Sequence, residues 1–334
     1  MSKKNKINNN RSKTLIIAEV GPNHNGSLKV ALNMIKKIAL TGADVIKFQL
    51  GNPKNVYSLD AIKADYQKKN DPSKSILEMS KRVQLRKEDH IKLKKACNKE
   101  GIIYACSAFD LESLKYLDKK INVPFFKIPS GEILSIDMLK YLSKSKKPVL
   151  LSTGMSTFKE ISYALNILNN KKVTIMHCVS SYPADKKNLN LNVIDKLKQK
   201  FKKEVGYSDH SLGSAACLAA VAKRVTVIEK HIIISRKSKG PDHKTSIEIK
   251  EFKNFVSEIK NLEIILGEEK KIFSKNEMNI RNVARKSLVT KKKILKGQRL
   301  SKNDLTFKRP GNGILPNMVK NVLGLNPLLV NYNS

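Results

Sequence analysis

The sequence predicts an α/β fold, a (β/α)8 TIM barrel followed by a small β-rich domain. Over about 260 residues, buried-strand runs alternate with segments of helical period, and eight such units match the roughly 250 residues of this barrel. Polar clusters containing histidine follow several of these runs, as at the catalytic face of a barrel. After Gly267 short β-type pieces flank turns instead. A doubly wound open sheet is the alternative, but Gly21-Pro22-Asn23-His24 after the first run is not a Gly-rich phosphate turn.

The expected strands are short apolar runs that end in polar or turn residues. They are Leu15–Val20, Asp44–Gln49, Ile102–Ser107, Phe125–Ile128, Val149–Thr153, Val173–Val179, Val205–Ser208 and Val225–His231. The expected helices repeat apolar residues every three or four positions. They are Leu28–Leu40, Lys87–Lys99, Leu111–Leu117, Ile136–Leu142, Phe158–Leu168, Val193–Phe201, Ser214–Lys223 and Ile249–Leu266, the last stopping at Gly267.

The remaining segments set the domain organisation. The connection Gly51–Arg86 is long and polar, and in a barrel it leaves the catalytic face, where we expect it to cover a substrate. We assign residues 1–13 to a disordered leader, 14–268 to the barrel, and 269–334 to a linker and the small domain. The small domain contains the expected strands Lys286–Thr290 and Leu305–Lys308, and we expect it to be short because the chain ends at Ser334.

Composition narrows the class of protein. The net charge is +36, but the lysines are spread over every expected helix rather than gathered with arginine and aromatics into one stripe. We therefore expect a solvated lysine surface and no nucleic-acid partner; a non-catalytic basic barrel that binds nucleic acid or another polyanion is the alternative. The four cysteines lack metal-type spacing and indicate reduced thiols. No apolar run approaches the ~20 residues of a membrane span, so we expect a cytoplasmic location.

Three residues at strand ends are candidates for catalysis or metal binding. His210 and His231 end neighbouring strands of the expected barrel, where two imidazoles can converge on one divalent metal and leave positions open for substrate oxygens. Glu19 ends the first strand, a usual place for an acid or base of a barrel enzyme, although a structurally paired glutamate is the alternative. His24 and Asn25 follow in a turn, where capping explains them equally well.

Two lysines interrupt otherwise apolar strand ends. Lys47 and Lys127 are expected to be buried, and a buried lysine is rare unless it is paired. Both would face one barrel mouth, which indicates an anion with more than one charged group. Hydroxyl side chains follow the same strand ends and complete a candidate phosphate or carboxylate pocket. They are Ser107, Ser130, Ser152, Thr153, Ser180 and Ser208.

Seven segments of the barrel and two of the small domain resemble the sialic acid synthase family, which includes legionaminic and pseudaminic acid synthases. In the barrel these are Ile17–Ser27, Gly42–Gln49, Lys127–Glu132, Leu151–Met155, His177–Pro183, Gly206–Ser211 and Ile228–His231. Val283–Val289 and Phe307–Ile314 resemble the antifreeze-like (SAF) domain of the same family. The resemblance covers nearly the whole chain, in the family's order.

The resemblance implies that phosphoenolpyruvate condenses with the open-chain aldehyde of an N-acylated hexose to give a nonulosonic acid and phosphate. It also implies a divalent metal on His210 and His231, with Mn²⁺ expected first and Mg²⁺ or Co²⁺ as alternatives. Carried over from the family, Glu19 is the catalytic carboxylate, and Tyr182 assists it. The acceptor stays open between N-acetylmannosamine and a 2,4-diacetamido-6-deoxyhexose, with a 6-phosphorylated hexose less favoured.

The same resemblance assigns the binding residues. Lys47, Ser107 and Ser208 would hold the carboxylate of phosphoenolpyruvate, and Lys127, Ser130, Ser152 and Ser180 would hold its phosphate. The residues that would bind the sugar are Gln49, Glu132, Asp242 and Arg309. Because the family inserts the arginine at the position of Arg309 into the partner's site, the resemblance implies a domain-swapped homodimer.

Overall fold

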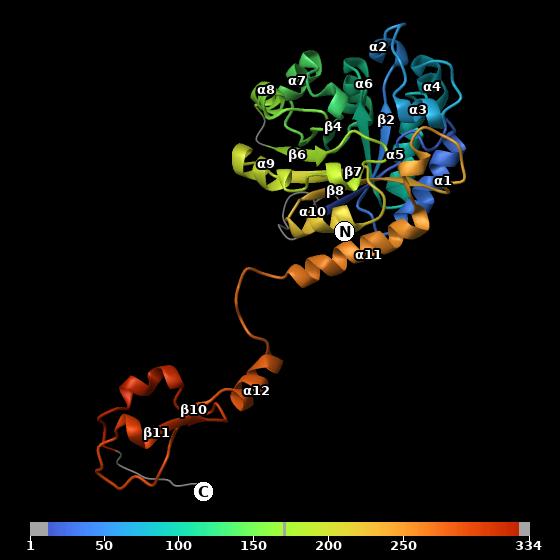
Figure 1. Ribbon diagram of the computed structural model, residues 1–334. Helices are drawn as coiled ribbons and strands as arrows, with labels where there is room; N and C mark the ends of the chain where they lie inside the picture. The colour runs from blue at the N-terminus through green and yellow to red at the C-terminus, as the bar shows by residue number, and fades with distance from the viewer. Residues whose placement is uncertain (1–12, 170–171, 327–334) are drawn as a thin grey trace. The chain divides into compact units, whose positions relative to one another are not determined.

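The computed structural model describes residues 13–169 and 172–326. In this part of the chain, eight parallel strands hydrogen-bond in sequence order, and β1 also pairs with β8, so the sheet closes into a barrel (Figure 1). The predicted (β/α)8 architecture is therefore confirmed, and the open-sheet alternative is wrong. Residues 1–12 of the predicted leader and the last eight residues of the predicted small domain lie outside the described residues.

The strands agree with the predicted runs to within a residue or two at their ends. They are β1 (Leu15–Glu19), β2 (Val45–Leu50), β3 (Ile103–Ala108), β4 (Phe126–Ile128), β5 (Val149–Ser152), β6 (Val173–Cys178), β7 (Val205–Asp209) and β8 (Val227–Ile233). The short β9 (Ile247–Glu248) pairs with β8 outside the barrel proper. Every pairing among these nine strands is parallel.

Successive side chains of each strand point to opposite faces of the sheet, so the hydrophobic core has an outer and an inner part. One face packs against the surrounding helices in a large cluster that includes Ile46, Phe48 and Tyr104. The other face fills the barrel interior with a small apolar cluster: Ile17, Val45, Ala105, Phe125, Leu150, Met176 and Val227. Gly206 belongs to this inner face, and a Cβ there would lie 2.3 Å from the sulfur of Met176, so only glycine makes room for that side chain.

Helices surround the barrel (Figure 1). Those that follow the strands are α1 (Leu28–Ala39), α5 (Asp89–Lys99), α6 (Leu111–Tyr116), α7 (Ile136–Ser143), α8 (Phe158–Leu168), α9 (Val193–Phe201), α10 (Ala215–Ala222) and α11 (Ile249–Leu266). Local chemistry fixes their ends: Ser27 accepts a hydrogen bond from the amide of Val30, and Thr157 and Glu160 form a reciprocal capping box. Helix α11 ends at Gly267, as predicted, where φ is 51°.

The polar connection between β2 and β3 forms three short helices that the sequence did not reveal. They are α2 (Pro53–Val56), α3 (Asp65–Asn70) and α4 (Ile76–Val83), and they lie together beyond the carboxyl end of β2 (Figure 1). Only α4 buries an apolar stripe, made of Ile76, Met79 and Val83. Helices of four to eight residues are too short to show a clear period, which explains why pattern alone missed them.

A second compact unit begins at Glu268, after Gly267. It contains α12 (Lys275–Ala284) and an antiparallel pair, β10 (Ser287–Thr290) with β11 (Leu305–Lys308). Both strands match the predicted ones, while α12 is not among the predicted helices. Nowhere in residues 13–169 and 172–326 does a helix combine the length and the apolar character needed to cross a membrane.

Candidate active site

A polar layer follows the small apolar cluster of the barrel interior, which we call the plug, toward the carboxyl ends of the strands. Because side chains alternate along a strand, Glu19, Lys47, Lys127 and Glu229 share the inner face with the plug residues two positions earlier on each strand. All four residues are at most 3% exposed. Four charged groups inside a barrel must be paired, because isolated buried charges are strongly disfavoured.

Glu229 forms one half of this layer. Lys127 Nζ donates to both carboxylate oxygens of Glu229, at 2.8 and 2.7 Å, and Ser208 Oγ donates to Oε1 at 3.0 Å. Lys47 Nζ lies 3.7 Å from the same carboxylate. Glu229 thus holds Lys127 directly and contacts the second lysine at longer range.

Glu19 forms the other half. Lys47 Nζ lies 2.7 Å from Glu19 Oε2 and also donates to Ser107 Oγ at 2.7 Å. Gln49 Nε2 donates to Glu19 Oε1 at 2.8 Å. The structure therefore brings together Glu19, Lys47, Gln49 and Ser107, four of the predicted site residues, on three consecutive strands.

The ionisation of these groups follows from burial and mutual charge. Burial and the charge of Glu229 raise the pKa of Glu19 against the opposing effect of Lys47. Burial disfavours the ammonium of Lys47, but Glu19 and Glu229 outweigh it and hold the pKa of Lys47 above its ordinary value. Burial lowers the pKa of Lys127, whereas Lys127 and Lys47 together overcome burial and lower the pKa of Glu229. The two carboxyl groups are thus differentiated, and Glu19 is the one poised to take up a proton.

The two predicted metal ligands lie side by side at the same mouth. The ring centroids of His210 and His231 are 5.4 Å apart, and the ring of Tyr182 stacks on His210 at 4.1 Å. His210 Nδ1 donates to the carbonyl of Val179 at 2.7 Å, which leaves Nε2 with a free lone pair. Burial lowers the pKa of both imidazoles, so both are in the neutral form that binds metals.

These residues fit a divalent ion with an open coordination sphere. His231 Nδ1 is buried, has no hydrogen-bond partner among the described residues, and lies 3.7 Å from Asp242 Oδ2. In the described part of the chain no set of three or more His, Cys, Asp or Glu is arranged around one metal position. The two imidazoles are therefore the protein groups at this mouth that could hold such an ion.

The hydroxyl residues predicted to bind phosphate lie around the ends of β4, β5 and β6. The amide of Gly154 donates to Ser130 Oγ at 3.0 Å and to Cys178 Sγ at 3.1 Å. A Cβ at Gly154 would lie 2.2 Å from Ser180 Oγ, so this glycine keeps a compact cradle open between the serines. Ser152 is buried at the end of β5, directly before it.

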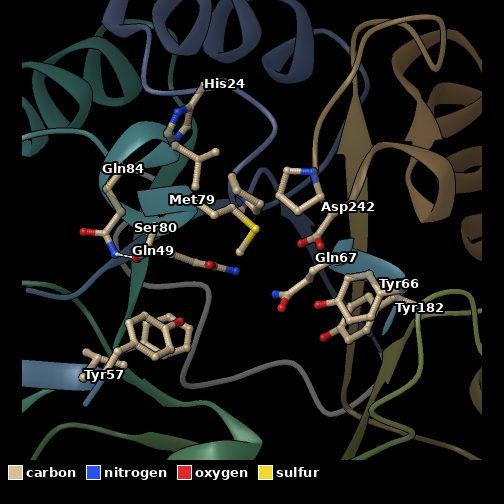
Figure 2. Close-up of a pocket in the computed structure, with 16 residues that line it drawn as sticks. His24, Gln49, Tyr57, Tyr66, Gln67, Met79, Ser80, Gln84, Tyr182 and Asp242 are labelled. Carbon is tan, nitrogen blue, oxygen red and sulfur yellow. Dashed lines mark hydrogen bonds between the residues drawn. The ribbon is translucent and has the colours of Figure 1, made fainter. Parts of the chain in front are cut away.

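A cavity of about 180 Å³ is lined by residues of the barrel mouth and of the insertion between β2 and β3 (Figure 2). Its wall includes Gln49, Tyr182 and Asp242 from the barrel side. The insertion contributes Val56, Tyr57, Tyr66, Gln67, Met79, Ser80, Val83 and Gln84. That the insertion covers a bound substrate stays a prediction.

Two further residues are predicted to bind the sugar, Glu132 and Arg309. Glu132 is half-buried after β4, where it accepts a hydrogen bond from Ser135 Oγ, and burial raises its pKa. Arg309 follows β11 in the second unit and is exposed there. Their roles at the sugar stay predictions.

Sequence reasoning gave no role to Glu229 or Cys178. Glu229 lies two residues before His231, and the period of two along a strand places it on the same inner face as that histidine. The spacing of two residues between Glu229 and His231 was therefore the feature of the sequence that could have identified Glu229. Cys178 ends β6 in the same way, with Met176 of the plug two residues before it.

Comparison with known proteins identifies the family to which the chain belongs. The chain matches the NeuB family over residues 34–271 and the SAF domain over residues 285–325. The chain belongs to the NeuB family. The family recognised from sequence motifs, the enzyme class and the two-part fold are therefore confirmed.

Curated members of the NeuB family align with nearly the whole chain. The N,N'-diacetyllegionaminic acid synthase of Campylobacter jejuni is 42% identical, covering 93% of this chain and 95% of the relative. The synthase of the same name from Legionella pneumophila is 37% identical, with 92% and 89% covered. A crystal structure of the N-acetylneuraminic acid (sialic acid) synthetase of Leptospira borgpetersenii superposes with a TM-score of 0.73 at 33% identity, covering 81% of this chain and 90% of that one.

Proposed function

We propose that this NeuB-family enzyme condenses phosphoenolpyruvate with an N-acylated hexose to give a nonulosonic acid and inorganic phosphate. The observation that carries the proposal is the buried Lys47–Glu19 and Lys127–Glu229 arrangement beside two neutral imidazoles. Packing alone does not explain four buried charges beside a histidine whose Nδ1 has no hydrogen-bond partner in the described part of the chain.

The charges at the mouth indicate how an anionic donor binds. Lys47 and Lys127 carry two positive charges, and Glu19 and Glu229 carry two negative ones when all four ionise, so their sum is zero. Phosphoenolpyruvate brings a carboxylate and a phosphate, and its binding requires additional positive charge or a proton on Glu19. His210 and His231 would hold a divalent ion, Mn²⁺ first with Mg²⁺ or Co²⁺ as alternatives, which supplies both charge and Lewis-acid polarisation of the acceptor aldehyde when bound.

The chain's own residues orient the donor. We assign the carboxylate of phosphoenolpyruvate to Lys47, Ser107 and Ser208, and its phosphate to Lys127 and the cradle of Ser130, Ser152 and Ser180. Both lysines are already fixed by ion pairs, so little side-chain entropy is lost when an anion replaces or shares the carboxylates.

The reaction forms one carbon–carbon bond and one carbon–oxygen bond, the latter from water, and breaks the carbon–oxygen bond to phosphate. The methylene carbon of phosphoenolpyruvate attacks the aldehyde carbon, whose oxygen takes up a proton and becomes a hydroxyl, and water adds to the resulting oxocarbenium-like carbon. Glu19, whose pKa is raised by burial, takes the proton of that water, and Tyr182 assists beside it. The tetrahedral intermediate then releases phosphate by C–O cleavage.

For the acceptor we propose a 2,4-diacetamido-6-deoxyhexose, with N-acetylmannosamine second. The two curated relatives compared above are both named N,N'-diacetyllegionaminic acid synthases, which supports this order. Gln49, Glu132 and Asp242 are the proposed partners of the sugar hydroxyls. Burial and the charge of Glu19 raise the pKa of Asp242 to about 7, so this carboxyl can donate as well as accept a hydrogen bond.

We further propose a domain-swapped homodimer in which Arg309 reaches the acceptor bound to the partner's barrel. We place the enzyme in the cytoplasm, where the four buried free thiols of the described chain would stay reduced. The direct test is phosphate release from phosphoenolpyruvate with a panel of hexoses, with mass analysis of each product. A full panel without phosphate release would overturn the proposed reaction.

A further inference from the structure

Asp209 and Lys230 form a buried ion pair on the outer face of the barrel, away from the groups that the proposed reaction uses. Lys230 Nζ lies 2.5 Å from Asp209 Oδ2, and each residue is only 1% exposed. Because side chains alternate along a strand, the pair lies on the face of β7 and β8 opposite to Ser208 and Glu229. Tyr207, which donates to Asp209 Oδ1 at 3.0 Å, belongs to the outer part of the core. The pair therefore does not face a ligand bound inside the barrel mouth.

This ion pair lies one residue before the two imidazoles of the mouth. Asp209 and Lys230 are opposite each other in the last register pair between β7 and β8. His210 and His231 come next on the two strands, and their ring centroids are 5.4 Å apart. Strand β7 ends at Asp209, whereas β8 continues beside β1, where His231 is opposite Glu19. His231 is thus held within the sheet, and His210 lies just beyond its own strand.

Backbone contacts tie His210 to the neighbouring β6 side of the mouth. Its Nδ1 donates to the carbonyl of Val179 at 2.7 Å, and its own carbonyl accepts from the amide of Ala184 at 2.9 Å. Both partners follow β6 in the chain. These contacts fix the ring relative to β6, but they do not set its distance from His231 on β8.

The link to β8 passes through the turn that contains His210. Asp209 Oδ1 accepts hydrogen bonds from the amide of Ser211 at 2.9 Å and from Ser211 Oγ at 2.7 Å, which closes the turn around His210. Lys230 Nζ donates to the carbonyl of Ser211 at 2.8 Å as well as to Asp209. One ammonium group on β8 therefore contacts the residue on each side of His210.

Stability alone does not account for such a pair. Apolar side chains of similar volume usually stabilise a core as well as a buried ion pair does, and the better attested use of buried charges is to fix one arrangement. The Asp209 carboxylate is fully engaged, since Cys217 Sγ also donates to Oδ2 at 3.2 Å. The hydrogen bonds of this carboxylate and of Lys230 give the turn a defined position relative to β8, which apolar contacts would not do.

We infer that Asp209 and Lys230 are positioning residues, which hold the imidazole of His210 at the separation from His231 that lets both reach one divalent ion. The inference rests on the proposed metal site at these histidines and adds two residues that act on it from outside the barrel. Neither residue touches the ion or the substrates. Their effect passes through the turn from Asp209 to Ser211.

The test removes both charges in one protein, Asp209→Asn with Lys230→Met. Asparagine keeps an acceptor oxygen for the amide of Ser211, and methionine fills the space of the lysine stem. Removal of Lys230 alone would leave a buried carboxylate without its counter-charge and would strongly destabilise the fold. Asp209→Asn alone is the second variant, because it breaks the ion pair and keeps the lysine side chain.

The measurement is Mn²⁺ binding to the metal-free full chain, followed by the electron paramagnetic resonance signal of free Mn²⁺. Both variants should raise the Kd for Mn²⁺ by about tenfold to a hundredfold, as changes in residues that orient metal ligands typically do. The number of ions bound per chain and, at saturating Mn²⁺, KM for phosphoenolpyruvate should stay the same. A merely structural defect would instead lower the number of ions bound per chain and leave Kd as it is.

Asp118→Asn with Lys147→Met is the matched control. These residues also form an ion pair, at 2.8 Å, in which the carboxylate accepts from a tyrosine hydroxyl, but Lys147 precedes β5 at the opposite end of the barrel. This control should lower the melting temperature and leave the Kd for Mn²⁺ unchanged.

Two outcomes would overturn the inference, and they are distinguishable. Unchanged Kd in both Asp209 variants, with weaker binding in His210→Ala, would show that the ion pair does not position His210 while the metal site stands. Equal Kd in His210→Ala and the unmodified protein would remove the metal site itself, and the inference with it. Phosphate release from phosphoenolpyruvate tests the condensation separately.

Discussion

Both carboxylate oxygens of Glu229 accept hydrogen bonds from Lys127, at 2.8 and 2.7 Å, across 102 residues of sequence. This pair connects β4 to β8 through the interior of the barrel, and Ser208 of β7 adds a third hydrogen bond to it. An anion that binds at Lys127 must therefore share the ammonium group with the Glu229 carboxylate or displace that carboxylate from it. Glu229 keeps the lysine charged and oriented for that exchange.

Glu229→Gln should destabilise the free protein and strengthen the effect of phosphoenolpyruvate on stability. The variant leaves buried Lys127 without its negative partner, which typically costs about 3 kcal/mol in the free energy of unfolding. Phosphoenolpyruvate supplies negative charge at the same place, so it should raise the melting temperature of the variant more than that of the unmodified protein. Thermal unfolding with and without phosphoenolpyruvate measures both effects.

Asp209→Asn is the matched control for Glu229→Gln. Asp209 and Lys230 form a buried pair at 2.5 Å, but Asp209 also contacts Tyr207 and Cys217, which belong to the outer core rather than the barrel interior. This variant should lose stability without any added response to phosphoenolpyruvate. A similar response of both variants would show that Glu229 does not compete with the donor.

Glu19→Gln should act on the chemical step. The amide keeps a hydrogen bond with Gln49 within reach but cannot take a proton, so kcat should fall ~10²–10⁴-fold with a much smaller change in KM for phosphoenolpyruvate. Glu132→Gln provides the comparison, because a sugar-binding residue should mainly raise KM for the acceptor. A loss in kcat below about threefold for Glu19→Gln would leave Glu19 as a structural carboxylate.

Metal removal should abolish turnover. We expect a chelator to stop phosphate release and Mn²⁺ to restore it, and His210→Ala to bind the ion weakly because one of two imidazoles is gone. His177→Ala is the control: this histidine is also buried, but its Nε2 contacts the carbonyl of Leu189 and its ring stacks on Tyr207. Full activity of metal-stripped His210→Ala protein would refute the assignment.

Arg309 gives a test of the swapped dimer. Glu19→Gln and Arg309→Ala should each be inactive alone, and mixed dimers should contain one site that has both intact residues. With random exchange, half of the dimers are mixed and half of their sites are intact, so about a quarter of the activity should return. If labelled subunits exchange and no activity returns, each site takes Arg309 from its own chain or does not use it.

Acid should destabilise the barrel through His90. Burial lowers the pKa of His90 from 6.5 to about 4, so between these pH values the unfolded chain binds a proton at His90 and the folded chain does not. The contribution of His90 to the free energy of unfolding is therefore fully present above pH 6.5, and it falls between pH 6.5 and 4 by up to about 3 kcal/mol. His90→Gln keeps a partner for the hydroxyl of Tyr104 and should show a shallower loss over the same interval in denaturant titrations. Equal slopes would contradict this origin.

The regular part of the fold was predictable because each strand and helix is locally encoded. The run Val173–Val179 in the sequence becomes β6, Val173–Cys178, since a parallel strand that is buried on both faces has a mainly apolar sequence. Strand ends also pointed to Glu19, Lys47, Lys127, His210 and His231, because polar residues that end apolar runs are conspicuous.

The pairing between those residues was not predictable. Glu229 pairs with Lys127 only because the closed barrel brings β8 opposite β4. Nothing in the sequence around residue 229 indicates Lys127 as its partner. The short helices of the insertion were missed for a related reason. Helix α3 has no buried residue, so it is fixed by contacts such as that of Asn70 with the carbonyl of Pro241 rather than by its own pattern.

The division of the site between strand ends and one insertion has a consequence for how such enzymes diversify. Eight of the sixteen residues around the cavity come from a single stretch, Val56 to Gln84, whereas the paired lysines and carboxylates are distributed over four strands. Exchange of that one stretch would rebuild half of the cavity wall and leave the paired lysines and carboxylates in place. The wall of the cavity can therefore change by local replacement, without redesign of the charged centre of the barrel.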